Sequence, residues 1–258
     1  ASLNTTTGHQ IGTTTLRSGS WDYPYFTGPL GDDGSRAVII RGLDLSTSYP
    51  SIEAQVIDTA SGVQIGDTIA LSGWSYGGFE VSDDGSRAML ITNAYADGPY
   101  LGYLSRLTVI DAAAGVRIGS TTTLDGFPDG GVRFDADTNR AVVTAMGSKY
   151  VDGQRMSTTE VAIINPATGL QLGTTLTLFD EVRSGSQVSG DGSIVVTSTG
   201  TKLAVLSTAA GRQLGNTITR ASIGGVVVSA DGDHVVFLTG PSSIFGWEPI
   251  QAEVLRIS

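Results

Sequence analysis

The sequence predicts an all-β protein, a five-bladed β-propeller with four antiparallel strands in each blade. The first observation behind this prediction is an internal repeat. A short element that ends in a hydrophobic residue followed by glycine recurs at Gly12, Gly66, Gly119, Gly173 and Gly215, at intervals of 54, 53, 54 and 42 residues. Repeats of this length are typical of folds built from one supersecondary unit. No segment shows the periodicity of an amphipathic helix.

Each repeat contains four short strand patterns, most clearly in the second repeat. Strand A is "GGFEVS", and an Asp-Gly turn joins it to strand B, "RAMLIT", whose apolar run indicates burial on both faces. Strand C is "LTVID", and strand D is "VRIGSTTTL", whose alternating threonines suit an exposed outer edge. Five such units favour a propeller over a linear β-solenoid or a pair of sandwiches.

The two ends of the chain are the second observation. The C-terminal "AEVLRIS" has the pattern of a strand C without a strand D, and the N-terminal "TTTGHQIGTTTL" has the pattern of a strand D without a strand C. Their pairing would complete one blade and close the ring, which a solenoid does not need. The sequence therefore predicts a single domain over 1–258. Its blades are expected at about 24–70, 77–123, 130–177, 185–219, and 224–258 together with 1–15.

The repeat resembles a known family. "VSDDGSRAMLITN" followed by "LTVIDAAAG" is similar to the YVTN (YncE-like) propeller repeat, with Leu90, Ile91, Thr92 and Asn93 in the position that gives the family its name. The resemblance extends over all five repeats, and it is specific for blade structure. Similar repeats occur in secreted and surface proteins of actinobacteria, so it implies a secreted or cell-surface location. Related propellers include lactonases and binding modules, and no catalytic residue is carried over.

Composition and charge exclude several function classes. The formal net charge of −10 argues against nucleic acid or an anionic membrane as partner. The chain has no cysteine, which excludes disulfides, thiol catalysis and cysteine-ligated metals. No apolar run approaches the roughly 18 residues of a membrane-spanning helix, so no membrane insertion is expected. We expect no cofactor. Whether the chain is a whole protein or one module of a larger one stays open.

One segment matches a catalytic motif. "GWSYGG", residues 73–78, fits the G-x-S-x-G pattern of a serine nucleophile elbow and resembles the elbow of prolyl-oligopeptidase-type peptidases. The equivalent segments of the other repeats do not keep Ser75, and the only histidines, His9 and His234, map to the opposite end of the blades. A Ser-His-Asp triad is therefore not expected, and the segment is interpreted as a loop between strands D and A.

Aromatic residues concentrate at one end of the predicted blades. Four connections between strands B and C are expected to be long loops, at 41–55, 92–106, 144–160 and 239–252. Most of the Phe, Trp and Tyr residues map to this end, where their apolar rings with polar handles suit a binding surface. The candidate ligand-binding residues are Trp21, Tyr23, Tyr25, Trp74, Tyr76, Tyr100, Tyr103, Tyr150, Trp247 and Glu248.

Two interpretations of this end remain open, because long loops also need aromatic residues for small cores of their own. The sequence favours a non-catalytic binding or spacer domain with a glycan or protein ligand. The alternative is a lactonase-like or glycoside hydrolase with a carboxylate site in the loops, for which the candidates are Asp129, Asp180 and Glu181. Asp22 and Glu248 are further acidic residues expected at this end. The Asp-Gly turns are expected to be hairpin turns, not calcium sites, and Glu80 and Arg133 an ion pair between blades.

Overall fold

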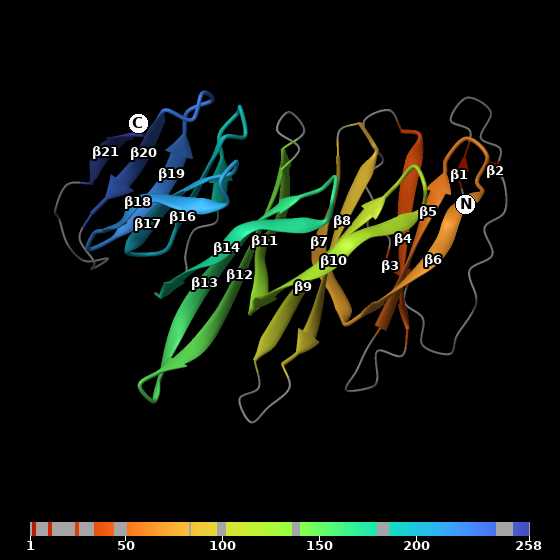
Figure 1. The fold of residues 1–258 in the computed structure, drawn as a ribbon, viewed down its shortest axis with the longest axis horizontal. Helices are drawn as coiled ribbons and strands as arrows, with labels where there is room; N and C mark the ends of the chain where they lie inside the picture. The colour runs from red at the N-terminus through yellow and green to blue at the C-terminus, as the bar shows by residue number, and fades with distance from the viewer. Residues whose placement is uncertain are drawn as a thin grey trace. The chain divides into compact units, whose positions relative to one another are not determined.

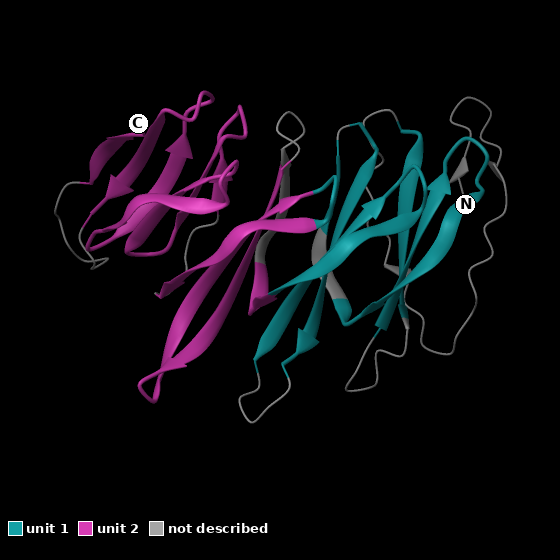
Figure 2. Cartoon of the chain, in the orientation of Figure 1, with its two compact units in different colours: residues 1–123, 166–169 teal, residues 124–165, 170–258 magenta. Residues whose placement is uncertain are grey.

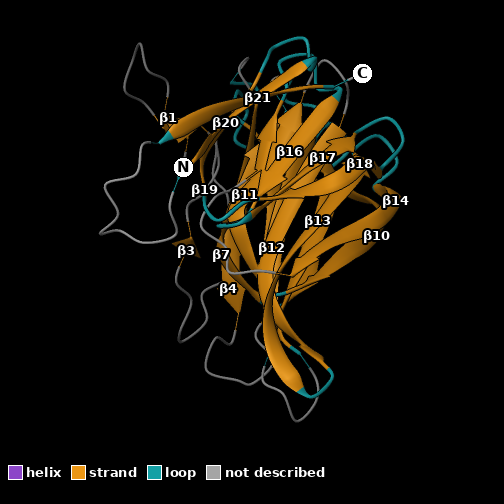
Figure 3. Cartoon of the chain, turned by 90° about the vertical axis from the view of Figure 1, so that its left-hand side faces the viewer, coloured by secondary structure: helices purple, strands orange, loops and turns teal. Residues whose placement is uncertain are grey.

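The computed structural model describes residues 2–3, 10–11, 24–25, 34–43, 51–82, 84–96, 102–135, 140–179, 186–240 and 250–257. These residues form strands and turns with no helix (Figure 3). The prediction of an all-β protein is therefore confirmed. Nor does the described part of the chain contain a helix that could span a bilayer. The chain divides into two compact units, residues 1–123 with 166–169 and residues 124–165 with 170–258 (Figure 2).

The strands pair in antiparallel sheets, each built from strands that follow one another along the chain (Figure 1). In unit 1 the first sheet contains β3 (Pro24–Tyr25), β4 (Arg36–Leu43), β5 (Ser51–Asp58) and β6 (Gln64–Ser72). The second contains β7 (Trp74–Val81), β8 (Arg87–Tyr95), β9 (Tyr103–Asp111) and β10 (Val116–Asp125), of which residues 124–125 belong to unit 2.

Unit 2 contains three further sheets. The first is formed by β11 (Phe127–Asp135), β12 (Arg140–Val151), β13 (Gln154–Asn165) and β14 (Leu170–Phe179). The next is formed by β15 (Ser186–Val188), β16 (Ile194–Ser198), β17 (Lys202–Ser207) and β18 (Arg212–Thr219). The last has three described strands, β19 (Ile223–Val228), β20 (His234–Thr239) and β21 (Gln251–Arg256).

The N-terminal strand predicted to close the ring has a local partner. β2 (Gln10–Ile11) pairs with β1 (Ser2–Leu3), with Leu3 opposite Gln10. Its pairing with β21 stays a prediction. Apart from this two-stranded pair, the fold consists of antiparallel sheets of three to four strands.

Successive sheets within each unit pack face to face. In unit 1 one apolar cluster joins Ile40 and Val56 of the first sheet to Leu90 and Ile110 of the second. In unit 2, Val142 and Val195 from neighbouring sheets belong to one cluster. The apolar run in β8 is buried on both faces, as predicted, since every residue from Ala88 to Asn93 is buried. Each such buried aliphatic side chain contributes about 1.5–3 kcal/mol to stability.

Three of the recurring glycines of strand D lie at contacts between sheets, whereas Gly215 has nothing among the described residues within 4 Å of its Cβ position. Gly66 on β6 touches the turn that contains Gly115, and Gly119 touches the turn that contains Gly169. In unit 2, Gly173 meets the turn that contains Gly211 in the same way. A Cβ atom on these residues would overlap a backbone carbonyl of the other segment. In these three repeats the glycine is therefore a close-approach position that lets one sheet lie on the next.

Three of the predicted loop segments are strands instead. Residues 144–160, expected to form a long loop, belong to the hairpin of β12 and β13, whose register runs to Val151 opposite Gln154. Asp152 and Gly153 form the two-residue turn with φ of 51° and 77°, the backbone that favours Asp-Gly in hairpins. The segments 73–78 and 126–131, also expected as loops, lie almost wholly in β7 and β11, each with a β-bulge.

Candidate functional site

Three aromatic side chains gather at one end of the β7–β10 sheet. Trp74 begins β7, Tyr95 ends β8 and Tyr103 begins β9, and antiparallel pairing brings these three strand ends together. The ring centroids of Trp74 and Tyr95 are 4.8 Å apart, those of Tyr95 and Tyr103 5.4 Å, and those of Trp74 and Tyr103 6.1 Å. We call these residues the Trp74 cluster. The two Trp74 contacts are edge-on, a favourable geometry for aromatic pairs.

The cluster combines a packed base with an exposed ring. Trp74 and Tyr103 are half-buried, whereas 47% of Tyr95 is exposed. The preceding Gly73 has φ of 104°, and a Cβ there would overlap the carbonyl of Asn93. The close backbone approach at Gly73 therefore fixes where Trp74 starts its strand. The arrangement offers a rigid apolar surface with phenol groups at its margin.

A buried polar pair lies beside the Trp74 cluster. Asn93 is opposite Trp74 in the strand pairing and is fully buried, and its Oδ1 lies 3.5 Å from the Ser105 hydroxyl. Among the described residues its Nδ2 has no hydrogen-bond partner. A buried amide donor left unsatisfied costs about 1–3 kcal/mol, and because Asn93 is fully buried this donor is not exposed at the surface of the cluster.

The structure brings together two of the ten residues predicted to bind ligand, Trp74 and Tyr103. Tyr95 was not among those ten, and only the strand register, which places it opposite Tyr103, identifies it. Tyr150 lies on the β12–β13 hairpin of unit 2 and is 51% exposed. The backbones of Tyr25 and Tyr76 lie in β3 and β7, but their side chains are outside the described residues. The other five are also outside them: Trp21, Tyr23, Tyr100, Trp247 and Glu248.

The carboxylates considered for hydrolysis cannot be placed relative to one another. Asp180 and Glu181 lie outside the described residues, as do the further acidic residue Asp22 and the side chain of Asp129 on β11. The predicted Glu80–Arg133 pair stays a prediction for the same reason, because the Arg133 side chain is not described. Within the described ranges, no group of three or more His, Asp or Glu residues has the arrangement of a metal site.

The backbone around Ser75 differs from that of a nucleophile elbow. An elbow is a sharp turn between a strand and a helix. Ser75 instead lies within β7, which runs from Trp74 to Val81 with a bulge before Gly78. The interpretation that the G-x-S-x-G match is not a hydrolase motif is thus supported by the strand geometry. Of the two histidines, His234 begins β20 beside an Asp-Gly turn, and His9 lies outside the described residues.

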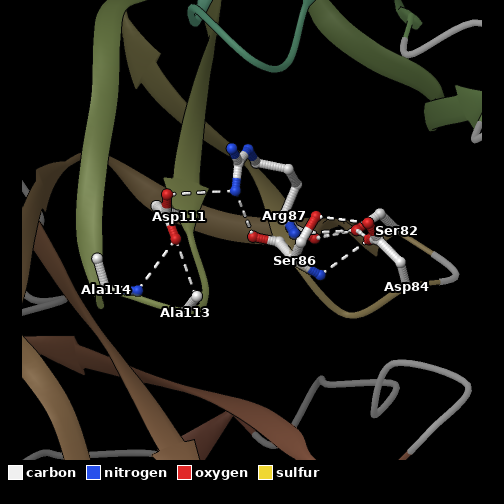
Figure 4. Close-up of polar contacts among 7 residues, drawn as sticks. All are labelled: Ser82, Asp84, Ser86, Arg87, Asp111, Ala113 and Ala114. Atoms are coloured by element: carbon white, nitrogen blue, oxygen red, sulfur yellow. Dashed lines mark hydrogen bonds and ion pairs between the residues drawn. The ribbon is translucent and has the colours of Figure 1, made fainter.

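The Asp-Gly turns are held by serine–aspartate contacts (Figure 4). Asp84 Oδ1 accepts hydrogen bonds from Ser82 Oγ at 2.6 Å and from Ser86 N at 2.9 Å, and Oδ2 accepts one from Ser86 Oγ at 2.8 Å. Arg87 N in turn donates to Ser82 Oγ, and the Arg87 side chain pairs with Asp111 at 3.2 Å. These carboxylate oxygens therefore serve the hairpin itself, as the sequence predicts.

The same contact recurs in unit 2. Ser189 Oγ donates to Asp191 at 2.6 Å and Ser229 Oγ donates to Asp231 at 2.5 Å. In both turns the hydrogen bond from the serine hydroxyl is the largest cause of an aspartate pKa below the ordinary value of 3.8. The hydroxyl of Ser82 lowers the pKa of Asp84 in unit 1 in the same way. A depressed carboxyl pKa contributes stability that is present above pH 3.8 and is lost as the pH falls through the pKa of the folded state.

Ser82→Ala is expected to lower the free energy of unfolding at pH 7 by about 1–2 kcal/mol. The hydroxyl is buried and joins Asp84 to the Arg87 amide, so its loss removes two hydrogen bonds. Urea unfolding at pH 7 and at pH 3 measures the effect. The cost should be smaller at pH 3, because this pH lies below the ordinary pKa of 3.8 and part of the Asp84 contribution is lost there. Ser86→Ala, at the more exposed side of the turn, is the control with the smaller expected loss. An equal loss for both serines would contradict the assignment.

Comparisons with known proteins give structural similarity alone. No protein-family model matches the sequence, and no curated protein is similar to it. Among solved structures, the chain is similar to the hydrazine synthase of Kuenenia stuttgartiensis, with 13% identity over 88% of this chain and 81% of that chain and a TM-score of 0.43. It is also similar to the β-propeller domain of the Trilobed protease from Pyrococcus furiosus, with 9% identity over 87% and 68% and a TM-score of 0.41. Similarities at this level identify neither a family nor a function.

Proposed function

We propose that the chain is a non-catalytic binding domain whose Trp74 cluster receives a glycan. The observation that carries the proposal is the gathering of Trp74, Tyr95 and Tyr103 at one end of a sheet, with Tyr95 47% exposed. Aromatic rings pack against the apolar faces of sugar rings, and tyrosine hydroxyls bond to sugar hydroxyls.

The proposal is tested by titrating the protein with soluble cell-wall glycans and neutral polysaccharides while following tryptophan fluorescence. We expect a saturable change, because Trp74 is in contact with the surface that the ligand covers. Tyr95→Ala should abolish it, since this change removes the exposed ring but keeps the fluorescent reporter. Circular dichroism and the thermal midpoint show that the variant is folded.

Tyr150→Ala is the matched control. Tyr150 is exposed to a similar extent, 51%, but lies on the β12–β13 hairpin of the other unit. Its replacement should leave the titration unchanged. A response that persists in Tyr95→Ala, or that is lost equally in both variants, would overturn the assignment to the Trp74 cluster. So would the lack of a response to every glycan.

We also propose that the sheets form a five-bladed propeller of the YVTN (YncE-like) type in a secreted or cell-surface protein. The face-to-face packing of successive sheets within each unit supports this architecture. Closure requires Gln10 of β2 to pair with Leu255 of β21. The equivalent pair in the first sheet is Ile57 opposite Gln64.

Ring closure is tested with a pair of cysteines in this cysteine-free chain. Gln10→Cys with Leu255→Cys should form an intramolecular disulfide under mild oxidation, detected as a loss of two hydrogens in the intact mass. Gln10→Cys with Val63→Cys is the control, because Val63 is exposed in the turn that joins β5 and β6 and is no partner of β2 in a closed ring. Equal disulfide yields in the two variants would contradict closure.

A further inference from the structure

A polar pocket opens between the two sheets of unit 1. It has a volume of about 250 Å³ and lies between β6 on one side and β8, β9 and β10 on the other. Two arginines, Arg106 and Arg117, contribute to its wall together with the hydroxyl groups of Thr92, Thr108 and Thr121. No acidic residue of the described chain lines it. The lining of this pocket is therefore positively charged, although the protein as a whole has a net charge of −10.

The position of Arg106 is occupied by a paired acidic residue in two other sheets. In the first sheet the equivalent residue is Glu53, which lies opposite Arg41 and bonds to it at 2.5 Å. In the sheet of β11–β14 it is Glu160, which Lys149 contacts at 2.5 Å. Each of these charges lies at a sheet surface with an opposite charge beside it, which offsets the cost of removing it from water.

Arg106 has the opposite charge at this position, as does Lys202 on β17, whose Nζ donates to the Phe179 carbonyl. The residue opposite Arg106 is Thr92, so the second sheet carries a positive charge on β9 without an acidic residue across the strand pair. In the described part of the chain Arg106 makes no hydrogen bond and no ion pair, although it is half-buried. Its planar guanidinium group therefore keeps all its donors available to the pocket.

Of the threonine hydroxyls in the pocket, that of Thr92 donates to the Ser72 carbonyl at 2.9 Å, whereas Thr108 and Thr121 provide a further donor. Thr108 Oγ1 and Thr121 Oγ1 are 3.2 Å apart, so one hydroxyl donates to the other and the second keeps its proton free. Among the described residues, Arg117 uses only its Nε, which donates to the Gly119 carbonyl at 3.2 Å, and its two terminal nitrogens make no hydrogen bond there. Two guanidinium groups and a hydroxyl donor around one small volume match the chemistry of an oxyanion.

We propose that this pocket binds a small oxyanion, either free in solution or carried as a single acidic group by a small ligand. Its volume is below the roughly 300–1,000 Å³ of pockets for drug-sized molecules, so a carboxylate, sulfate or phosphate group fits better than an extended chain. The site is distinct from the Trp74 cluster. Arg106 and Tyr103 are three residues apart on β9, so their side chains leave opposite faces of the sheet. It therefore stands or fails independently of glycan binding.

The site is tested by calorimetric titration of the folded protein with sodium sulfate, phosphate, acetate and glucuronate at constant ionic strength. We expect saturable binding of at least one of them. Sulfate or phosphate alone would identify a tetrahedral oxyanion, and acetate with glucuronate would identify a carboxylate; both support the proposal. Glucuronate alone also supports it and indicates a ligand-borne acidic group. No saturable binding of any of the four anions would overturn the proposal.

Arg106→Gln should weaken the binding by at least about tenfold, because a hydrogen bond to a charged group is lost. Arg117→Gln, at an exposed position on β10, is a second variant that is expected to fold normally and to weaken binding less. Arg155→Gln is the matched control, since Arg155 is an exposed arginine that bonds to Ser148 on the β12–β13 hairpin. Equal affinities in Arg106→Gln and Arg155→Gln would place the anion elsewhere and refute the assignment.

Discussion

Gly115→Ala is expected to lower the free energy of unfolding by about 2–5 kcal/mol. Gly115 has φ of 65°, a conformation in which a residue with a Cβ loses roughly 1–2 kcal/mol. Its Cβ would also overlap the carbonyl oxygen of Ile65 and crowd Gly66. Because the obstacle is backbone on a packed sheet, relief requires the two sheets to separate locally, and overpacking of this kind adds about 1–3 kcal/mol. Chemical unfolding at pH 7 measures the loss.

Gly153→Ala separates the two contributions. Gly153 has a similar φ, 77°, but nothing lies within 4 Å of the position that its Cβ would take. Its replacement should therefore show only the conformational cost, about 1–2 kcal/mol. If the two variants lose the same stability, the close contact between the sheets has no energetic weight and the role assigned to the repeated glycine is wrong.

The sequence predicted the strands well where pattern alone determines them. The run from Ala88 to Asn93 is buried throughout, as its apolar composition indicated. The Asp-Gly turn before it has the contacts expected of a hairpin. The glycine repeat, by contrast, was recognised only as a period. That Gly66 touches the turn of Gly115 depends on packing between sheets, which a one-dimensional pattern does not contain.

The main error in the sequence-based prediction of the fold was the length of the strands. The segment 144–160 contains polar residues on both faces, such as Ser148, Gln154 and Ser157, so it lacks the alternation that marks a half-buried strand. Its hairpin is determined by the Asp152–Gly153 turn and by the register that this turn imposes. The sequence contains an Asp-Gly dipeptide that favours a hairpin turn, but the polar composition of the segment led to the prediction of a loop.

The candidate sites show the same limit. Trp74 and Tyr103 could be proposed from composition, because aromatic residues gathered at one end of the repeats. Tyr95 follows only from the pairing that sets it opposite Tyr103. The pocket at Arg106 could not be predicted, because it depends on the absence of an acidic residue opposite Arg106 and on the spacing between two sheets. Binding sites formed between repeats depend on side chains that no single repeat contains.

Lys149→Met is expected to lower the free energy of unfolding by about 2–3 kcal/mol. Lys149 Nζ contacts Glu160 Oε1 at 2.5 Å and Asp125 Oδ2 at 3.2 Å, and Glu160 is only 4% exposed. Breaking a buried pair leaves a charge without compensation and costs about 3–5 kcal/mol. The lower figure applies here because the Lys149 side chain is about one-third exposed and water screens part of the interaction.

The pH dependence follows from the direction of the lysine pKa. The hydrogen bond to Glu160 raises the pKa of Lys149 above its ordinary value of 10.5. A raised pKa means that the contribution is fully present below pH 10.5 and is lost as the pH rises through the pKa of the folded state. The difference between wild type and Lys149→Met should therefore stay constant from pH 7 to pH 10. A decline within that range would contradict the ion pair.

The double variant Lys149→Met with Glu160→Gln distinguishes a stranded charge from lost packing. Glutamine keeps an acceptor for the Asp125 amide, which donates to Glu160 Oε2 at 2.8 Å, but it carries no charge. The double variant should thus be more stable than Lys149→Met alone, because the uncompensated carboxylate has been removed. The double variant could instead lose as much stability as Lys149→Met and Glu160→Gln lose together. In that case the lysine stabilises the sheet through its hydrocarbon chain, and the charge of Glu160 is dispensable.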